Sequence, residues 1–265
     1  MSELLNKKKG VYIFPNLLTT GGMFFGFFAI MAALRGNYED SAQAIVAAGV
    51  FDGLDGRVAR AMNATSAFGK EYDSLADFLS FGIAPAVLIY LWALKPFDRV
   101  GWAAAFLYAV CGALRLARFN VQQHVIQDER VSKRYFQGLP IPAAATVVSA
   151  MILFYQAWGI PAEEGNTVGL WRWLPLFLTF VLGMLMVSTI RFRSMKDFHW
   201  HRQRPFLALV GVVIFIAVLT IQMASTLFLM SWAYLFSAIH SHREYRQLLA
   251  EGKEVEEDEV EDLTV

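Results

Sequence analysis

Four aspartates lie close together in a chain that is otherwise rich in apolar residues: Asp52, Asp55, Asp73 and Asp77. Asp52 and Asp55 are three residues apart and Asp73 and Asp77 are four apart, so on helices the members of each pair share one face. The link between the two helices, from about Met62 to Glu71, is short, which makes the helices antiparallel neighbours. The spacing therefore predicts that the two acidic faces converge into one cluster.

The negative charge of this cluster must be offset, because carboxylates held together in a medium of low dielectric repel one another. Protonation, pairing with Arg57 and Arg60, or divalent cations would offset it. Two arginines cannot neutralise four acids, and clustered hard oxygen ligands suit Mg²⁺ or Mn²⁺. Two such ions about 4 Å apart would balance the charge and supply a centre for phosphoryl transfer.

Two other interpretations of the cluster lead to other classes of protein. The acids can pair with basic residues and serve only to hold helices together. In a metal- or proton-coupled transporter, acids are expected along the depth of several helices and beside broken helices near the middle of the membrane. The four aspartates instead lie near one end of their helices, which favours a site at the membrane surface.

The composition indicates that these helices lie in a lipid environment. Of the 265 residues, 56% are hydrophobic and 17% are charged, against about 25% charged in soluble domains. Apolar segments of about 16 to 24 residues recur, a length that crosses about 30 Å of hydrocarbon. We predict an all-α, polytopic membrane helix bundle with about eight transmembrane helices. The predicted spans are Val11–Leu34, Ala42–Ala61, Tyr72–Leu94, Val100–Val121, Ile141–Gly159, Trp171–Ile190, Phe206–Ile221 and Ser225–Ile239.

Basic residues predict the orientation, because Lys and Arg stay preferentially on the cytoplasmic side of a membrane. With the N-terminus inside, only Arg35, Lys95, Arg99 and Arg172 fall outside the cytoplasmic segments. We therefore expect a multi-pass protein of the cell (cytoplasmic) membrane, with both termini and the aspartate cluster at the cytoplasmic face.

The chain divides into one membrane domain, residues 1–243, and a short tail, residues 244–265. Acids dominate the tail between Glu251 and Asp262, a composition that is typical of solvated, disordered segments. We expect this tail to be cytoplasmic and disordered.

The stretch DGLDGRVARAMNATSAFGKEYDSLAD has the pattern D-x2-D-G-x2-A-R-x8-G-x3-D-x3-D, which resembles the complete signature of the CDP-alcohol phosphatidyltransferase family. The resemblance implies transfer of the phosphatidyl group of a CDP-linked lipid to a small alcohol, with CMP as the leaving group. It also implies that Asp52, Asp55 and Asp73 bind metal ions. Asp77 would accept the proton of the alcohol and would also contact a metal ion.

The same resemblance implies residues that bind the CDP-linked lipid. Gly56 and Arg60 would hold the pyrophosphate and the nucleotide, with Ser66 assisting from the loop. PNLLT in the first span resembles an element of the family's first helix, so Asn16 and Thr19 are expected at the cytidine site. Residues 1–243 would then form a transmembrane phosphatidyltransferase domain.

Three further stretches bear on the acceptor alcohol. FGIAPA at 81–86, ALRLARFN at 113–120 and FQGLPIPAAA at 136–145 resemble the phosphatidylserine synthase branch of the family. This resemblance implies that the substrates are CDP-diacylglycerol and L-serine, and that the partners are membrane lipid and, by analogy, a second copy in a homodimer. We expect no nucleic-acid partner.

Recognition of serine requires a group for its carboxylate, which an arginine can bind through two parallel hydrogen bonds. Arg115 and Arg118 lie at the cytoplasmic end of the fourth predicted span, and Asn120 can add hydrogen bonds. The preference of basic residues for the cytoplasmic side explains these arginines equally well. Glycerol 3-phosphate, inositol phosphate and other alcohols therefore stay open as alternative acceptors.

Overall fold

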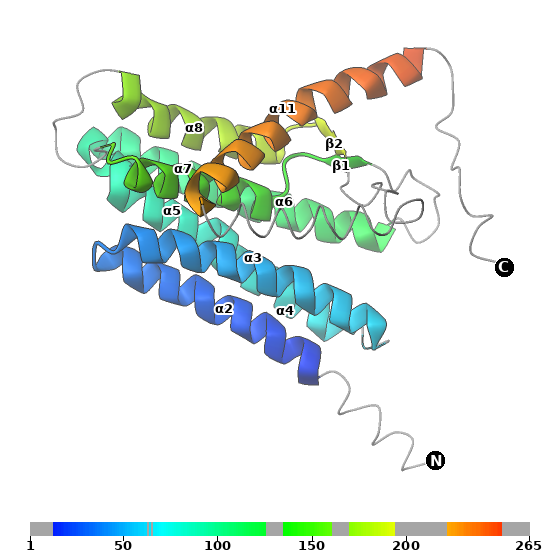
Figure 1. Ribbon diagram of the computed structural model, residues 1–265. Helices are drawn as coiled ribbons and strands as arrows, with labels where there is room; N and C mark the ends of the chain where they lie inside the picture. The colour runs from blue at the N-terminus through cyan, green and yellow to red at the C-terminus, as the bar shows by residue number, and fades with distance from the viewer. Residues whose placement is uncertain are drawn as a thin grey trace, which may run out of the picture.

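The described part of the chain is a bundle of helices. The computed structural model describes residues 13–62, 64, 66–125, 135–160, 170–193 and 222–250. Helices α2 (Ile13–Leu34) and α3 (Tyr38–Ala61) lie along one side of the bundle, and α8 (Leu170–Val187) lies on the opposite side (Figure 1). The helical fold class predicted from the sequence is confirmed for these residues.

Helices α2 and α3 form an antiparallel hairpin. Gly36 takes a positive φ of 80° in the turn, and the Asn37 N–H donates a hydrogen bond to the Ala32 carbonyl at 3.0 Å. The Ser41 hydroxyl donates to the Ala29 carbonyl at 2.7 Å. Small buried residues line the contact between the helices, among them Ala29, Ala33, Ala44 and Ala48. The hairpin therefore brings the first turns of α2 beside the last turns of α3.

A continuous helical rod follows α3. It consists of α4 (Ala67–Asp77), the π-helix η1 (Phe78–Ile83), α5 (Ala84–Ile89) and the π-helix η2 (Tyr90–Leu94). The predicted span began at Tyr72, whereas α4 begins at Ala67. The reason is a helix cap: the Gly69 N–H donates to the Ser66 hydroxyl at 3.0 Å. The link after α3 is shorter than predicted, so α4 starts close to the end of α3.

The π-helix η1 lies directly against α2. The Ser80 hydroxyl donates to the Gly22 carbonyl at 3.2 Å, and a Cβ at Gly26 would collide with Ser80. Only glycine at position 26 permits this close approach. Because η1 begins immediately after Asp77, its contact with α2 fixes the end of α4 that carries this acid.

The chain reverses at the 3₁₀ turn η3 (Lys95–Phe97), and α6 (Asp98–Val125) runs back along η1, α5 and η2. Asp98 has a φ of 48°, in the left-handed region. Gly101 lies against the Leu94 carbonyl, where a Cβ would not fit. The 55-residue apolar helical stretch Ala67–Val121 is therefore two antiparallel segments, as the sequence predicted.

Helix α7 (Ile141–Ala157) lies in the core of the bundle and contacts α3 and α11 (Met223–Ala250). Most of its side chains are buried. Phe154 of α7 stacks on Phe228 of α11 with 4.3 Å between ring centroids, which joins the C-terminal helix to the core. Helix α8 packs mainly on α6.

One short antiparallel pair of strands departs from the all-α prediction. β1 (Tyr135–Gln137) pairs with β2 (Arg191–Arg193), with Phe136 opposite Phe192. The Gly138 N–H donates to the Ile190 carbonyl at 2.9 Å, and Gly138 has a φ of 79°. These backbone hydrogen bonds tie the segment before α7 to the segment after α8, which a search for helical periodicity does not detect.

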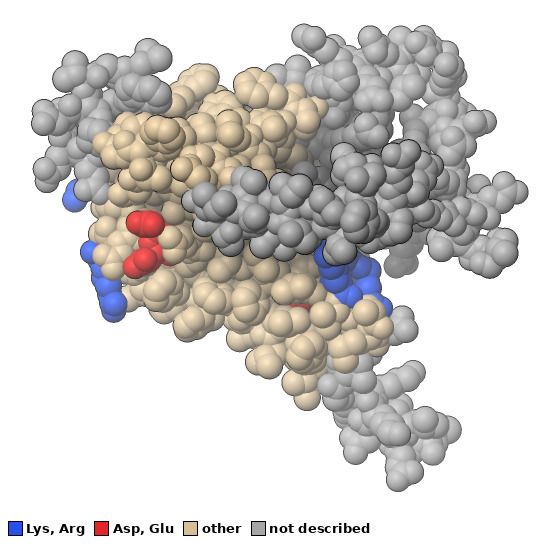
Figure 2. All heavy atoms as spheres, viewed as in Figure 1, with Lys and Arg blue, Asp and Glu red and all other residues tan. Residues whose placement is uncertain are grey.

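The surface of the described part is apolar between two charged ends. Figure 2 shows charged atoms gathered toward two ends of the molecule, acidic and basic atoms together at one end and basic atoms at the other, with a wide uncharged region between them on the face in view. Two described helical stretches, Ile13–Leu34 and Ala67–Val121, are apolar and long enough to cross a membrane. Shorter apolar helices cover Ile141–Ala157, Trp173–Val187 and Met223–Ser237. This pattern is typical of a helical membrane protein.

Most predicted spans coincide with described helices. The predicted span Phe206–Ile221 lies outside the described residues. Helix α11 contains the predicted span Ser225–Ile239 and continues to Ala250, past the boundary expected at residue 243. Residues 251–265 of the predicted tail lie outside the described residues.

Candidate active site

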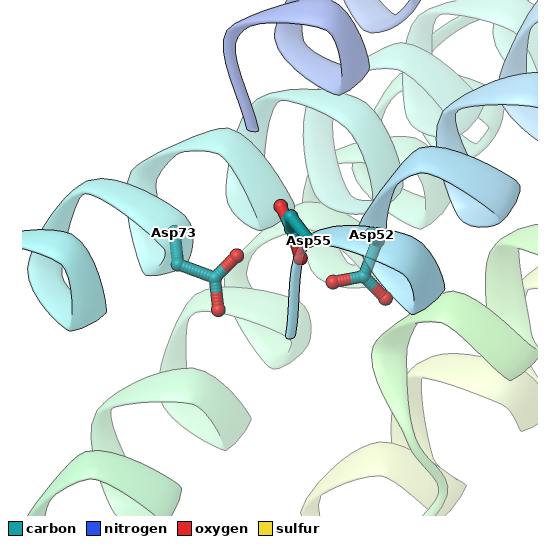
Figure 3. Close-up of side chains that lie close together, drawn as sticks. All are labelled: Asp52, Asp55 and Asp73. Atoms are coloured by element: carbon teal, nitrogen blue, oxygen red, sulfur yellow. The ribbon is translucent and has the colours of Figure 1, made fainter. Parts of the chain in front are cut away.

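Three of the four aspartates converge at one end of the bundle. Asp52 and Asp55 come from α3 and Asp73 comes from α4, and one carboxylate oxygen of each lies within 4.8 Å of the other two. Figure 3 shows Asp52 and Asp73 turning their carboxylates toward each other, with Asp55 between them. Asp55 is only 5% exposed. The structure thus assembles the cluster that the helical spacing predicted.

The first helix holds the central carboxylate in place. The Thr19 hydroxyl of α2 donates a hydrogen bond to Oδ2 of Asp55 at 2.7 Å, and it also lies 3.2 Å from the Pro15 carbonyl. A hydrogen bond to one carboxylate oxygen fixes the rotation of the group and leaves the other oxygen available. Thr19 also lines the cavity beside the cluster, so its predicted place at the cytidine site stays a prediction.

Asp77 lies beside the cluster of three. Its carboxyl group shares a side-chain hydrogen bond with Asp52, and it stands near Asp73 and Asp55. It is not among the three residues whose oxygens converge within 4.8 Å. Its position next to the cluster is therefore observed, whereas its contact with a metal ion stays a prediction.

The donor set fits a hard divalent cation. Three carboxylate oxygens that converge from two helices are the ligand type that Mg²⁺ and Mn²⁺ prefer. A divalent cation among them would also offset the repulsion between acids that are largely shielded from water. Asp52, Asp55 and Asp73 are the residues that would hold it.

A cavity of about 350 Å³ opens beside the carboxylates. Its walls come from α2, α3, α4 and α6, and they include most of the residues singled out from the sequence. These are Asn16, Thr19, Asp55, Gly56, Arg60, Ser66, Asp73, Asp77, Arg115 and Asn120. Asp52 lines a small adjoining cavity together with Asp55, Asp73 and Asp77. Residues that are far apart in the sequence therefore meet around one space.

The part of the cavity near the α3–α4 link is suited to an anion. The Arg60 guanidinium lies above Gly56, where a Cβ would stand 3.6 Å from its Nη1 atom. Asn16 reaches the first turn of α4, where its Oδ1 would stand 3.5 Å from a Cβ at Gly69. Ser66 lines the same region, although its hydroxyl already caps α4. The predicted residues for the CDP-linked lipid thus lie together.

Helix α6 forms the opposite side of the cavity. Arg115 is 9% exposed, lines the cavity and lies over the Phe119 ring, with 5.5 Å from its Cζ to the ring centroid. The Asn120 amide donates to the Ser74 hydroxyl of α4 at 3.0 Å. This side therefore combines a buried cation with neutral polar groups.

Arg118 is not brought to the cavity. Its Nη1 donates to the Val187 carbonyl of α8 at 3.0 Å, and it is absent from the cavity lining. The reason is the helical repeat: Arg115, Leu116, Phe119 and Asn120 mark the face of α6 that turns to the cavity. At about 100° per residue, Arg118 projects about 130° away from the centre of that face.

Lys70, Ser74 and Phe119 also line the cavity and were not singled out from the sequence. Lys70 and Ser74 share the polar face of α4 with Asp73, whereas Phe68 and Leu75 are exposed on the other face. Helical periodicity starting from Asp73 could have identified both residues. Phe119 carries no such signal, because an aromatic residue in an apolar helix reads as an ordinary packing residue.

A helical bundle with an apolar surface, a carboxylate cluster and a cavity lined by cations is suited to chemistry on the phosphate groups of lipids. The family model for CDP-alcohol phosphatidyltransferase matches residues 12–185, and the chain belongs to this family. The match covers α2 through α8 except the last residues of α8, and so includes every helix that lines the cavity.

Several curated proteins are similar to this chain over most of its length. The CDP-diacylglycerol–serine O-phosphatidyltransferase of Helicobacter pylori (strain ATCC 700392 / 26695) is 40% identical over 202 residues, which cover 76% of this chain and 80% of that protein. The protein of the same name from Mycobacterium leprae (strain TN) is 35% identical over 243 residues, 87% of this chain and 76% of that protein. The archaetidylserine synthase of Methanothermobacter thermautotrophicus is 33% identical over 193 residues, 71% of this chain and 74% of that protein.

Proposed function

We propose that this protein transfers the phosphatidyl group of CDP-diacylglycerol to the hydroxyl of L-serine, giving phosphatidylserine and CMP. The observation that carries the proposal is the cavity in which the aspartate cluster faces a buried arginine. The similar proteins support serine as the acceptor, because their names share serine while they differ in the lipid that they name.

One side of the cavity binds the CDP-linked lipid, and the opposite side binds serine. Arg60 with Gly56, assisted by Asn16 and Ser66, holds the pyrophosphate and nucleotide of the CDP-linked lipid. Arg115 binds the carboxylate of serine through charge-assisted hydrogen bonds. Asn120 and Ser74 lie where they can orient the amino acid. Arg118 is not included, because it lies off the cavity.

Asp77 is proposed as the general base. The serine hydroxyl oxygen bonds to the phosphorus that carries diacylglycerol, and its proton passes to a carboxylate oxygen of Asp77. The bond from that phosphorus to the bridging pyrophosphate oxygen breaks, and this oxygen leaves with CMP. A positioned base contributes about 10² to 10⁴ in rate. Asp77 stands beside the carboxylate cluster and lines the cavity, so it can reach both substrates.

Asp52, Asp55 and Asp73 are proposed to hold two divalent cations, Mg²⁺ or Mn²⁺, with Asp77 at their edge. When bound, the cations offset negative charge on the pyrophosphate. Thr19 contributes by fixing the Asp55 carboxylate.

We further propose that residues 1–243 form the transmembrane phosphatidyltransferase domain, with about eight spans and both termini in the cytoplasm. The cavity then opens at the cytoplasmic face, where a water-soluble acceptor meets a lipid donor. Asn37, in the α2–α3 turn, and Ala67, at the start of α4, are both exposed and mark opposite ends of the bundle. A membrane-impermeant thiol reagent should label Asn37→Cys in intact cells and Ala67→Cys only after permeabilisation. The reverse pattern would contradict this orientation.

The acceptor is tested directly by an acceptor panel. Purified full-length protein receives CDP-diacylglycerol, Mn²⁺ or Mg²⁺, and labelled L-serine, glycerol 3-phosphate or inositol phosphate in parallel. We expect labelled phosphatidylserine and an equal amount of CMP with serine alone. Turnover with another acceptor and none with serine would refute serine as the substrate. If liposomes containing the protein instead show an ion flux that is lost when the aspartates are replaced, and no CMP is released, the protein would be a transporter.

The family resemblance also leads us to propose a homodimer. The mass of the purified protein in a defined lipid nanodisc, measured by light scattering, tests this proposal. Only monomers across a range of protein concentrations would contradict it.

A further inference from the structure

A second cavity lies at the α2–α3 turn, at the end of the hairpin away from the aspartates (Figure 1). Its volume is about 370 Å³, similar to that of the cavity beside the carboxylates, and the two cavities share no lining residue. The lining comes from one face of α2 and from the start of α3. It includes Phe24, Phe27, Phe28, Met31, Arg35 and Asp40. The proposed reaction uses none of these residues, so this cavity is a separate site.

The α2 part of this cavity is an apolar groove. Its four residues, Phe24, Phe27, Phe28 and Met31, are all exposed, and their spacing places them on one face of the helix. At 1.5 Å per residue, the distance along α2 from Phe24 to Arg35 is about 16 Å. This length is about half of the roughly 30 Å hydrocarbon core of a membrane. The groove therefore extends through the depth of one lipid leaflet, which is the depth that an acyl chain occupies.

Two opposite charges lie at the end of the groove. Arg35 follows the last turn of α2 and Asp40 lies in the first turn of α3, and both are exposed in the cavity lining. Among the described residues, neither side chain has a hydrogen-bond or ion-pair partner. The turn that carries them is fixed, because the Tyr38 hydroxyl donates to the Leu91 carbonyl of η2 at 3.3 Å. The cavity thus presents one free cation and one free anion, within the described part of the chain, beside an apolar groove.

We propose that this cavity binds one molecule of phosphatidylethanolamine. Arg35 binds the phosphate through charge-assisted hydrogen bonds, Asp40 binds the primary ammonium, and one acyl chain lies along the apolar groove. This site is distinct from the site for the CDP-linked lipid, and the inference goes beyond the proposed function. It does not depend on which alcohol is the acceptor.

The charges of the lining favour this headgroup over other phospholipid headgroups. Phosphatidylglycerol has a phosphate for Arg35 and no ammonium for Asp40. Phosphatidylserine adds a carboxylate, for which the described lining offers no second Lys or Arg. The quaternary ammonium of phosphatidylcholine has no N–H and cannot donate a hydrogen bond to a carboxylate. A headgroup with one phosphate and one primary ammonium matches one arginine and one aspartate.

Native mass spectrometry of the purified full-length protein in detergent tests the proposal. The protein is titrated with phosphatidylethanolamine, phosphatidylglycerol, phosphatidylserine or phosphatidylcholine, all with the same acyl chains. We expect the wild type to bind one phosphatidylethanolamine about fivefold more tightly than phosphatidylglycerol, the upper range for an exposed ion pair. Equal affinities for these two lipids, or tighter binding of phosphatidylserine or phosphatidylcholine, would overturn the proposal.

Variants assign the two charges. Arg35→Gln should weaken the binding of all four lipids about fivefold, because all of them carry the phosphate. Asp40→Asn should remove the preference for phosphatidylethanolamine over phosphatidylglycerol. Arg99→Gln is the matched control and should change neither quantity, because Arg99 is an exposed arginine of α6 outside the cavity lining. A preference that persists in Asp40→Asn would overturn the proposal, as would equal effects of Arg35→Gln and Arg99→Gln.

A further variant tests the groove. Phe27→Ala should weaken all four lipids about fourfold, the effect of losing roughly one buried methylene group of contact. Unchanged affinities would contradict the placement of the acyl chain. A second copy of this chain is the other possible occupant. If Phe27→Ala lowers the mass measured by light scattering from dimer to monomer and leaves lipid binding unchanged, the groove is a contact between copies and the lipid proposal is wrong. Because the titrations measure binding without turnover, their failure would leave the proposed function unaffected.

Discussion

The two sides of the cavity are built differently. The acidic side, Asp52, Asp55, Asp73 and Asp77 on α3 and α4, lies within one short sequence motif, and its carboxylates are close to one another and to Thr19. The basic side is Arg115 with its α6 neighbours. It depends on how α6 packs against η1 and α8, and no described residue accepts a hydrogen bond from the Arg115 Nε–H. The carboxylates of the acidic side already converge in the structure, whereas in the proposed function the substrate completes the basic side.

Because of this difference, we expect substitutions on the two sides to have different kinetic effects. Changes on the acidic side should reduce metal binding or the rate of transfer with any acceptor alcohol. Changes on the basic side should affect the KM for serine and leave the donor lipid unaffected. Four single-residue variants test this division.

The largest effect is expected for Asp52→Ala. Removing one of three converging carboxylates should abolish metal binding and lower kcat by about 10³-fold or more, because the cation offsets charge on the pyrophosphate. Mn²⁺ binding followed by electron paramagnetic resonance, together with CMP release, measures both quantities. Wild-type activity in this variant would contradict the metal site.

Asp77→Asn should lower kcat by about 10² to 10⁴, the usual contribution of a general base, while Mn²⁺ binding is retained. The amide keeps the shape of the side chain and cannot accept the proton of the acceptor. Mn²⁺ binding by electron paramagnetic resonance and CMP release, measured together, distinguish a base from a metal ligand. Loss of Mn²⁺ binding together with activity would place Asp77 among the essential ligands and leave the base unassigned.

Arg115→Gln should lower kcat/KM for serine by about 10- to 100-fold, which corresponds to about 1.5 to 3 kcal/mol for hydrogen bonds to a charged group. The KM for CDP-diacylglycerol should stay within twofold. Arg118→Gln is the matched comparison, because Arg118 lies one turn further along α6 and donates to the Val187 carbonyl. A larger effect of Arg118→Gln on the KM for serine would reverse the assignment of the basic side.

Thr19→Val should weaken metal affinity by about tenfold, since it removes the hydrogen bond that fixes Asp55 and keeps the volume of the side chain. Added Mn²⁺ should restore activity. Thr20→Val is the control, because the neighbouring hydroxyl hydrogen-bonds with the Tyr72 hydroxyl at 2.9 Å and does not touch the aspartates. Equal effects of the two variants would show that the Thr19–Asp55 bond has no special role.

The acidic side could be predicted from the sequence because helical spacing alone brings Asp52 and Asp55, and Asp73 and Asp77, onto common faces. Local hydrogen bonds determine where each helix begins, which the spacing does not predict. The Ser66 cap moves the start of α4 to Ala67, so Lys70 belongs to the same helix as Asp73 and lines the cavity with it.

The basic side could be predicted only in part. Arg115 and Arg118 are equivalent in sequence terms, since both are arginines at one end of an apolar helix. Only the packing of α6 on α8 decides that Arg118 reaches the Val187 carbonyl and that Arg115 lines the cavity.

The order of the helices followed from apolar length, while some of their boundaries did not. The reversal at η3 agrees with a gap between two predicted spans, and the left-handed Asp98 and the close contact of Gly101 explain how so short a turn is made. The strand pair β1–β2 depends on backbone hydrogen bonds between distant segments, which periodicity within one segment cannot show.

In the proposed function, a phosphatidyl group is transferred to serine in the cavity with Asp77 as the base. The most direct measurement is the release of CMP and the formation of phosphatidylserine from CDP-diacylglycerol and labelled L-serine by purified wild type and Asp77→Asn, with Mn²⁺ binding measured on the same samples. We expect equal amounts of both products from the wild type, and from Asp77→Asn a loss of both products with Mn²⁺ still bound. Phosphatidylserine formation by Asp77→Asn at the wild-type rate, or wild-type CMP release that does not depend on serine, would contradict it.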